Sequence, residues 1–146
     1  MMNILIGTIG ANLTLGVISG LTTTITSLYT LSSALYRNTS NENIDDIVDI
    51  INKSDIENDI NIVKNVIEKI DKHNETIDLC IKNLNEIMTE IKDELEKIHY
   101  RIKYNEKLWI KNSLTKYDFT NSKKRLLGHI DVFNHRYKKL LEILSV

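Results

Sequence analysis

The sequence predicts an all-α protein, in which long heptad-patterned helices form an antiparallel coiled-coil or helical bundle behind an apolar N-terminal helix. Two observations carry this prediction. The 146 residues include no proline, which favours a few long helices joined by short links, because proline interrupts helix interiors and is common in turns. Apolar residues also recur at spacings of three and four over long stretches, which is the pattern of a helix that buries one face.

The first unit, residues 1–37, is expected to be an apolar helix. Residues 1–36 carry no charged side chain. The run from Ile4 to Leu21 would form a helix about 27 Å long, which barely crosses a hydrocarbon core of about 30 Å. From Thr22 to Tyr36 the pattern is amphipathic with an uncharged polar face. This helix therefore either enters a membrane or is buried inside the bundle that residues 38–146 are expected to form.

Four of the five glycines lie in this first unit, at Gly7, Gly10, Gly16 and Gly20. Small residues let helices approach closely, and Gly16 and Gly20 have the spacing of a membrane dimer motif. The four glycines are therefore candidate contacts with a membrane or a partner. A secretory leader is not expected, because no basic residue precedes the apolar run.

A polar link at 38–41 precedes an expected short acidic helix from Glu42 to Ile51, with Ile44, Ile47, Val48 and Ile51 inward. The run Ser54–Glu57 reads as a capping box, in which Ser54 and Glu57 would start the next helix.

The strongest pattern extends from Ile56 to Ile102 and predicts one helix about 70 Å long. Asn74 occupies a seam position and resembles the register-setting asparagine of parallel dimers, although the polar run 72–76 is a place where the helix could break and restart. Apolar Val66, Cys80 and Ile87 widen the seam, which favours a bundle within the chain and leaves self-association through the heptad faces open. The seam residues are Ile56, Ile60, Val63, Ile67, Ile70, Asn74, Ile77, Ile81, Leu84, Met88, Ile91, Leu95, Ile98 and Ile102.

A last heptad helix is expected from Thr120 or Asn121, after a connection at 111–119. Helices joined by so short a link usually pack antiparallel. The charge distribution agrees, because residues 37–100 carry a net charge of −8 and residues 101–146 a net charge of +7. The seam residues here are Leu126, Ile130, Phe133, Tyr137, Leu140 and Leu144.

No arrangement for catalysis or metal binding is recognisable. The histidines His73, His99, His129 and His135 have no repeating zinc spacing, and Cys80 fits a small buried apolar residue. We therefore expect no enzyme activity, no cofactor, no metal and no small-molecule substrate.

Lys123, Lys124 and Arg125, with Trp109 nearby, are the other candidate partner contacts. Such a cluster can meet phosphate groups. It is small, however, and an acidic helix of the same chain is available, so pairing within the chain or a solvated face is the favoured interpretation. Nucleic acid is not the expected partner, and binding to anionic lipid head groups is the remaining alternative.

Several short runs resemble a group of small, uncharacterised helical proteins of mimivirus-like giant DNA viruses. These runs are Ser27–Tyr36, Cys80–Leu84, Ile98–Ile102, Glu106–Trp109 and Asn134–Leu144. The resemblance implies a viral origin and a helical architecture, but it implies no activity. The order of an apolar glycine-rich N-terminus, a long heptad helix and a returning heptad helix also resembles viral class I fusion subunits.

Two functions follow as expectations. The first is a non-enzymatic helical interaction or scaffold protein, viral and associated with a virion or membrane, located in the virion or in the host cytoplasm or membrane. The alternative is a membrane-perturbing or fusion-like protein that acts through its N-terminal helix.

Overall fold

Five helices make up the fold in the computed structural model, which describes residues 2–35, 42–109 and 119–145. They are α1 (Met2–Leu35), α2 (Glu42–Ser54), α3 (Ile56–Lys69), α4 (Glu75–Trp109) and α5 (Thr120–Leu144). The all-α prediction is confirmed, as are the first helix, the short acidic helix and the start of the last helix at Thr120. The expected connection falls mostly on 110–118, outside the described residues.

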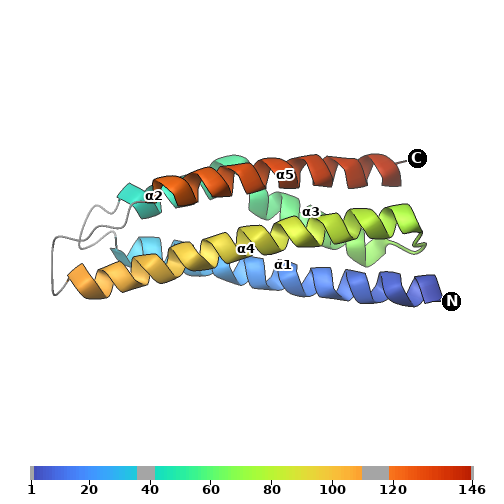
Figure 1. The fold of residues 1–146 in the computed structure, drawn as a ribbon, viewed down its shortest axis with the longest axis horizontal. Coiled ribbons are helices and arrows are strands. Elements are labelled where there is room, and N and C mark those ends of the chain that lie inside the picture. The colour runs from blue at the N-terminus through green and yellow to red at the C-terminus, as the bar shows by residue number, and fades with distance from the viewer. Residues whose placement is uncertain (1, 36–41, 110–118, 146) are drawn as a thin grey trace.

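The helices lie side by side along one long axis, as a bundle (Figure 1). Helices α1 and α4 run in one direction, whereas α2, α3 and α5 run in the other. Helix α4 makes the most extensive contacts, with α1 on one side and α5 on the other. The structure therefore confirms the predicted antiparallel packing, which it shows between α4 and α5.

The prediction of a single rod from Ile56 to Ile102 is wrong. Helix α3 ends at Lys69, and α4 begins at Glu75. Asn74 caps α4, because its side-chain oxygen accepts the Ile77 N–H at 2.8 Å and its carbonyl accepts the Asp78 N–H at 2.9 Å. Asn74 is therefore an exposed helix cap and does not set the register of a dimer. The break lets one apolar stripe fold back, so that both of its halves cover the same core.

The junction between α2 and α3 also differs from the expected capping box. Helix α3 begins at Ile56, but the Ser54 hydroxyl donates to the Ile51 carbonyl at 3.0 Å, inside the end of α2. Asp55 makes the bend with a left-handed φ of 57°, a conformation that aspartate tolerates better than most residues. The bend keeps Ile51 and Ile56 both in the core.

The core runs the length of the bundle and includes α1. Ile18, Leu21, Ile25 and Leu28 of α1 are each almost fully buried, so this helix packs as a bundle helix and shares its core with residues from 44 onward. None of the helices in the described ranges is long and apolar enough to cross a membrane.

Candidate interaction surface on helices α4 and α5

Polar side chains fix how α4 and α5 align. The Arg136 guanidinium donates to the Asn83 carbonyl at 2.7 Å, and His129 lies 3.5 Å from the Glu90 carboxylate. Asn83 and Glu90 are seven residues apart on α4, and Arg136 and His129 are seven apart on α5. The two contacts therefore repeat at the heptad spacing, and a shifted alignment would break both.

The third contact in this row is an ion pair between a buried carboxylate and a half-exposed guanidinium. Glu94 is only 4% exposed, and the Arg125 Nε lies 3.2 Å from each of its carboxylate oxygens. An Arg125 terminal nitrogen also donates to the Ser122 hydroxyl at 3.3 Å. Burying a carboxylate costs free energy unless the carboxylate is paired. Arg125 therefore offsets the cost of burying Glu94.

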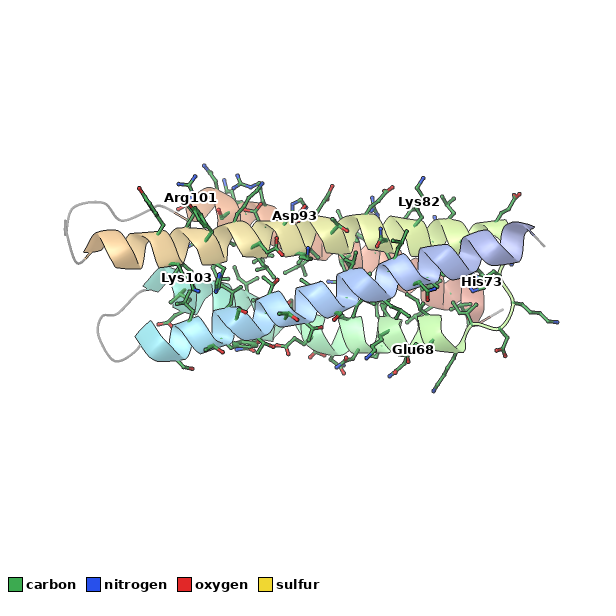
Figure 2. The ribbon with its side chains drawn as sticks, turned by 90° about the horizontal axis from the view of Figure 1, so that it is seen from below. Glu68, His73, Lys82, Asp93, Arg101 and Lys103 are labelled. Carbon is green, nitrogen blue, oxygen red and sulfur yellow. The ribbon has the colours of Figure 1, made fainter. Side chains whose placement is uncertain are left out.

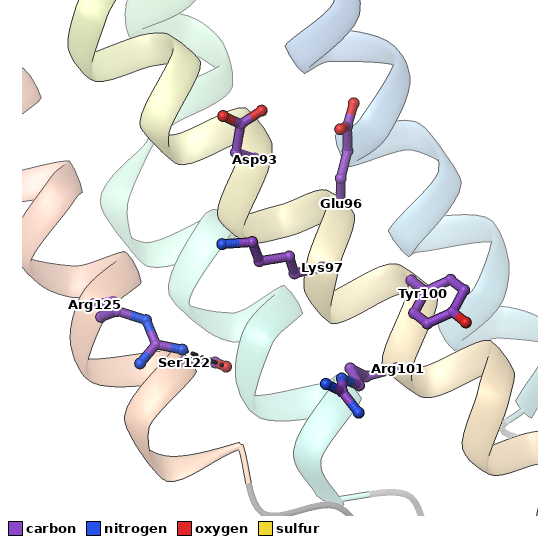
Figure 3. Close-up of a pocket in the computed structure, with 7 residues that line it drawn as sticks. All are labelled: Asp93, Glu96, Lys97, Tyr100, Arg101, Ser122 and Arg125. Atoms are coloured by element: carbon purple, nitrogen blue, oxygen red, sulfur yellow. Dashed lines mark hydrogen bonds between the residues drawn. The ribbon is translucent and has the colours of Figure 1, made fainter.

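A groove of about 510 Å³ opens beside this ion pair (Figure 3). Five of its residues come from α4 and two from the first turns of α5: Asp93, Glu96, Lys97, Tyr100, Arg101, Ser122 and Arg125. Figure 3 shows Asp93 and Glu96 toward one end and Tyr100, Arg101, Ser122 and Arg125 toward the other, with Lys97 between them. The groove is therefore charged along its length, with its two signs separated.

One wall of the groove continues into an exposed strip of α4, which we call the tyrosine–lysine face and define as Lys97, Tyr100, Arg101 and Tyr104. The other exposed residue of this stretch, Lys103, projects toward α1 (Figure 2). Tyr100 and Tyr104 are 65% and 48% exposed, and their rings stack with centroids 6.3 Å apart and planes 12° apart. Tyrosine and arginine are enriched in protein interfaces.

The four glycines predicted to contact a membrane or a partner all lie on α1, and that contact stays a prediction. A Cβ placed on Gly10 or Gly16 would meet nothing within 4 Å, whereas one on Gly20 would lie 2.8 Å from the Lys92 Cε. Gly7 lies in α1, but its surroundings are outside the described residues. Among the glycines whose surroundings the structure describes, Gly20 alone makes a close approach, and it does so to a flexible side chain.

The predicted basic contacts are largely used inside the protein. Lys123 pairs with Asp46 of α2 at 3.0 Å, and Arg125 pairs with Glu94. Lys124 is exposed, and Trp109 is the last residue of α4, with its side chain outside the described residues. The expectation of pairing within the chain is confirmed for Lys123 and Arg125, while contact with a partner stays a prediction for all four.

Sequence reasoning missed the tyrosine–lysine face. Its signal is present in the run from Lys97 to Tyr104, in which Ile98 and Ile102 are core residues. Apart from these two and His99, all residues of the run are lysine, arginine or tyrosine. Clusters of consecutive cations do not reveal such a face. A helical face spreads its residues over every third and fourth position.

The remaining titratable groups lie apart from this surface. Within the described ranges, no three His, Cys, Asp or Glu side chains are close enough to hold a metal ion, and Cys80 is a buried free thiol. His99 lines a small cavity between α4 and α1 with Lys103, Thr26, Ser27, Thr30 and Leu31. Burial and the Lys103 ammonium lower the pKa of His99.

Comparisons with known proteins give no relative from which a function could be carried over: no family model, no curated protein and no solved structure matches the chain. The functional argument therefore depends on the geometry of the bundle and its surface.

Proposed function

We propose that this chain is a non-enzymatic helical scaffold, of viral origin and associated with a virion or membrane, that binds a protein partner through α4. The observation that supports the proposal is the tyrosine–lysine face, on which two exposed, stacked tyrosines lie beside the two cations Lys97 and Arg101. Burying the apolar faces of these rings against a partner is favourable, while the tyrosine hydroxyls can keep their hydrogen bonds. The long core supplies a rigid base for such a surface, since interfaces bind best when they are preorganised.

The polar contacts between helices support a structural role for the bundle. Lys123, Arg125, His129 and Arg136 of α5 each contact another helix. These polar contacts hold the helices in one alignment, so that the outward residues of α4 keep fixed positions.

Partner capture from the cell that naturally makes the protein tests this proposal. A variant carrying Tyr100→Ala and Tyr104→Ala should lose the protein that the unmodified chain captures. Leu79→Ala is the matched control, because Leu79 is 56% exposed on the same helix and lies outside the face. Capture of the same protein by the double variant, at the same yield, would contradict the proposal.

A membrane-perturbing action of α1 is the second candidate. It is favoured by the complete lack of charge on residues 1–36, even where the helix is exposed, as at Leu13, which is 64% exposed. Flotation with lipid vesicles tests it in the full chain: Leu13→Asp should abolish flotation, while Leu127→Asp, at a leucine 52% exposed on α5, should not. If the unmodified chain does not float, this candidate is wrong.

A further inference from the structure

A second row of residues with heptad spacing runs along the outer side of α4. Its positions alternate steps of four and three, as those of the core row do, but every member is exposed. Residues at this spacing lie along one side of a helix, so the row presents a continuous strip about 27 Å long. The six residues, which we call the outer row, are Glu86, Glu90, Asp93, Lys97, Tyr100 and Tyr104.

The outer row is divided by its chemistry into two halves. The first half consists of three carboxylates, and the second half consists of one lysine and two tyrosines. The lysine ammonium and the tyrosine hydroxyls can each donate a hydrogen bond to a carboxylate. The two halves of the strip are therefore complementary to each other.

The order of residues in the outer row is symmetric about position 95. Each carboxylate and one donor residue lie equally far from this position, on opposite sides of it. An antiparallel second copy of α4, aligned at the same position, would place every carboxylate opposite a donor of its neighbour. In a two-fold symmetric pair each of these contacts forms twice. The matching pairs are Asp93 with Lys97, Glu90 with Tyr100, and Glu86 with Tyr104.

We infer that two copies of this chain associate through the outer row, with their α4 helices antiparallel and aligned at position 95. This inference rests on the proposed function and names the partner of α4 as a second copy of the chain. Lys97 of each copy pairs with Asp93 of the other. The hydroxyls of Tyr100 and Tyr104 donate to the glutamates of the other copy, and their rings bury apolar surface in the contact.

The charged groups of the outer row are available for these contacts. Among the residues that the structure describes, Glu86, Asp93 and Lys97 take part in no ion pair. Glu90 lies 3.5 Å from His129, but its side chain is 59% exposed. A carboxylate has two oxygens that accept hydrogen bonds, so Glu90 can accept a tyrosine hydroxyl as well.

Other arrangements of two α4 helices fit the outer row less well. Parallel copies would place each residue opposite itself, so that carboxylates meet carboxylates. An antiparallel pair that slides by one heptad in one direction would place Glu90 opposite Asp93, and like charges in contact are unfavourable. A slide in the other direction would leave Glu86 and Glu90 without a donor from the row. Alignment at position 95 alone uses all six residues.

Sedimentation velocity of the full-length protein at low salt, from about 1 μM to about 1 mM, tests the inference over the range of tight to weak association. The unmodified chain should form a reversible dimer. Asp93→Lys and Lys97→Asp should each weaken the dimer about tenfold, because two ion pairs become two like-charge pairs.

Lys82→Asp is the matched control, because it makes the same charge change as Lys97→Asp at an exposed position outside the outer row. Lys82 also projects from the side of α4 that faces away from α1 (Figure 2). This variant should dimerise as the unmodified chain does. Circular dichroism should show equal helix content in all of these proteins.

An equimolar mixture of the Asp93→Lys and Lys97→Asp proteins tests the alignment itself. In a mixed dimer the introduced lysine faces the introduced aspartate, and the original Lys97 faces the original Asp93. The mixture should therefore dimerise about as strongly as the unmodified chain, although each variant alone does not.

Four results would overturn the inference: an unmodified chain that stays monomeric, a dimer that neither charge reversal weakens, an equal loss in the Lys82→Asp protein, or a mixture that does not recover the dimer. Capture through Tyr100 and Tyr104 is measured separately. If the chain stays monomeric while these tyrosines capture a different protein, the inference is wrong and the proposed function is unaffected.

Discussion

Helix α4 contacts its two neighbours in different ways. Its contact with α1 is parallel, and α1 contributes no charged residue to it. Its contact with α5 is antiparallel and is crossed by Arg125, His129 and Arg136. The hydroxyls of α1 mostly bond within their own helix, as Thr14 does to the Gly10 carbonyl and Thr24 to the Gly20 carbonyl, each at 2.9 Å.

The difference shows that the interactions that stabilise the bundle are not the same as those that fix the alignment of its helices. Both contacts bury apolar side chains of the same kind, which stabilise in proportion to area and without direction. Within the part of the chain that the structure describes, the α4–α5 contact adds directional polar pairs that select one register. The α1–α4 contact consists mainly of an apolar row.

The largest expected effect is common to both contacts. Leu21→Ala in α1 and Phe133→Ala in α5 each remove a side chain that is 0% exposed, and each should lower the free energy of unfolding by about 2–5 kcal/mol. Urea denaturation followed by circular dichroism measures this. If Leu21→Ala cost less than about 1 kcal/mol, α1 would not belong to the cooperative core.

Arg125→Met tests the polar part of the α4–α5 contact, which the α1–α4 contact does not share. It leaves the Glu94 carboxylate buried without its ion pair, which should cost about 1–3 kcal/mol, reduced from the full value because Arg125 is half exposed. Lys123→Met is the control, since its partner Asp46 is exposed and the loss should stay below about 1 kcal/mol. Equal losses of unfolding free energy in the two variants would show that burial of the Glu94 carboxylate adds no cost beyond that of a surface ion pair.

Glycine substitutions test how closely α1 and α4 approach. Gly16→Ala should stabilise the chain by about 0.5–1 kcal/mol, because alanine favours helix and a Cβ at this position meets nothing within 4 Å. Gly20→Ala should gain less, since its Cβ would force Lys92 to move. Thermal melts of the two variants give the comparison, and a larger gain at Gly20 would contradict the structure.

The smallest expected effect is the pH response of the α1–α4 contact. Because the pKa of His99 is lowered in the folded chain, the unfolded chain binds more protons, and stability should be lost as the pH falls below about 6.5. Since α1 offers no carboxylate, it cannot neutralise the new charge. His99→Gln should make stability fall less between pH 7.5 and pH 5.5, and an unchanged slope would show that His99 does not contribute.

Much of the helical architecture was predictable from the sequence, because apolar spacing reports which face of a helix is buried. The heptad spacing places Leu84 and Phe133 in buried rows, and the structure buries both. The candidate surface was less predictable. Lys123 and Arg125 are cations in the sequence, but only their distances to Asp46 and Glu94 show that they are used within the chain.

By itself, the sequence determined the all-α class, the uncharged first helix and the rows of core residues, since these follow from local spacing and composition. Only the tertiary structure decided that the row from Ile56 to Ile102 belongs to two helices, because a heptad pattern continues unchanged through a reversal of the chain. It also decided which charges pair across α4 and α5 and which stay on the surface. That outcome depends on distances between helices, which local spacing does not contain.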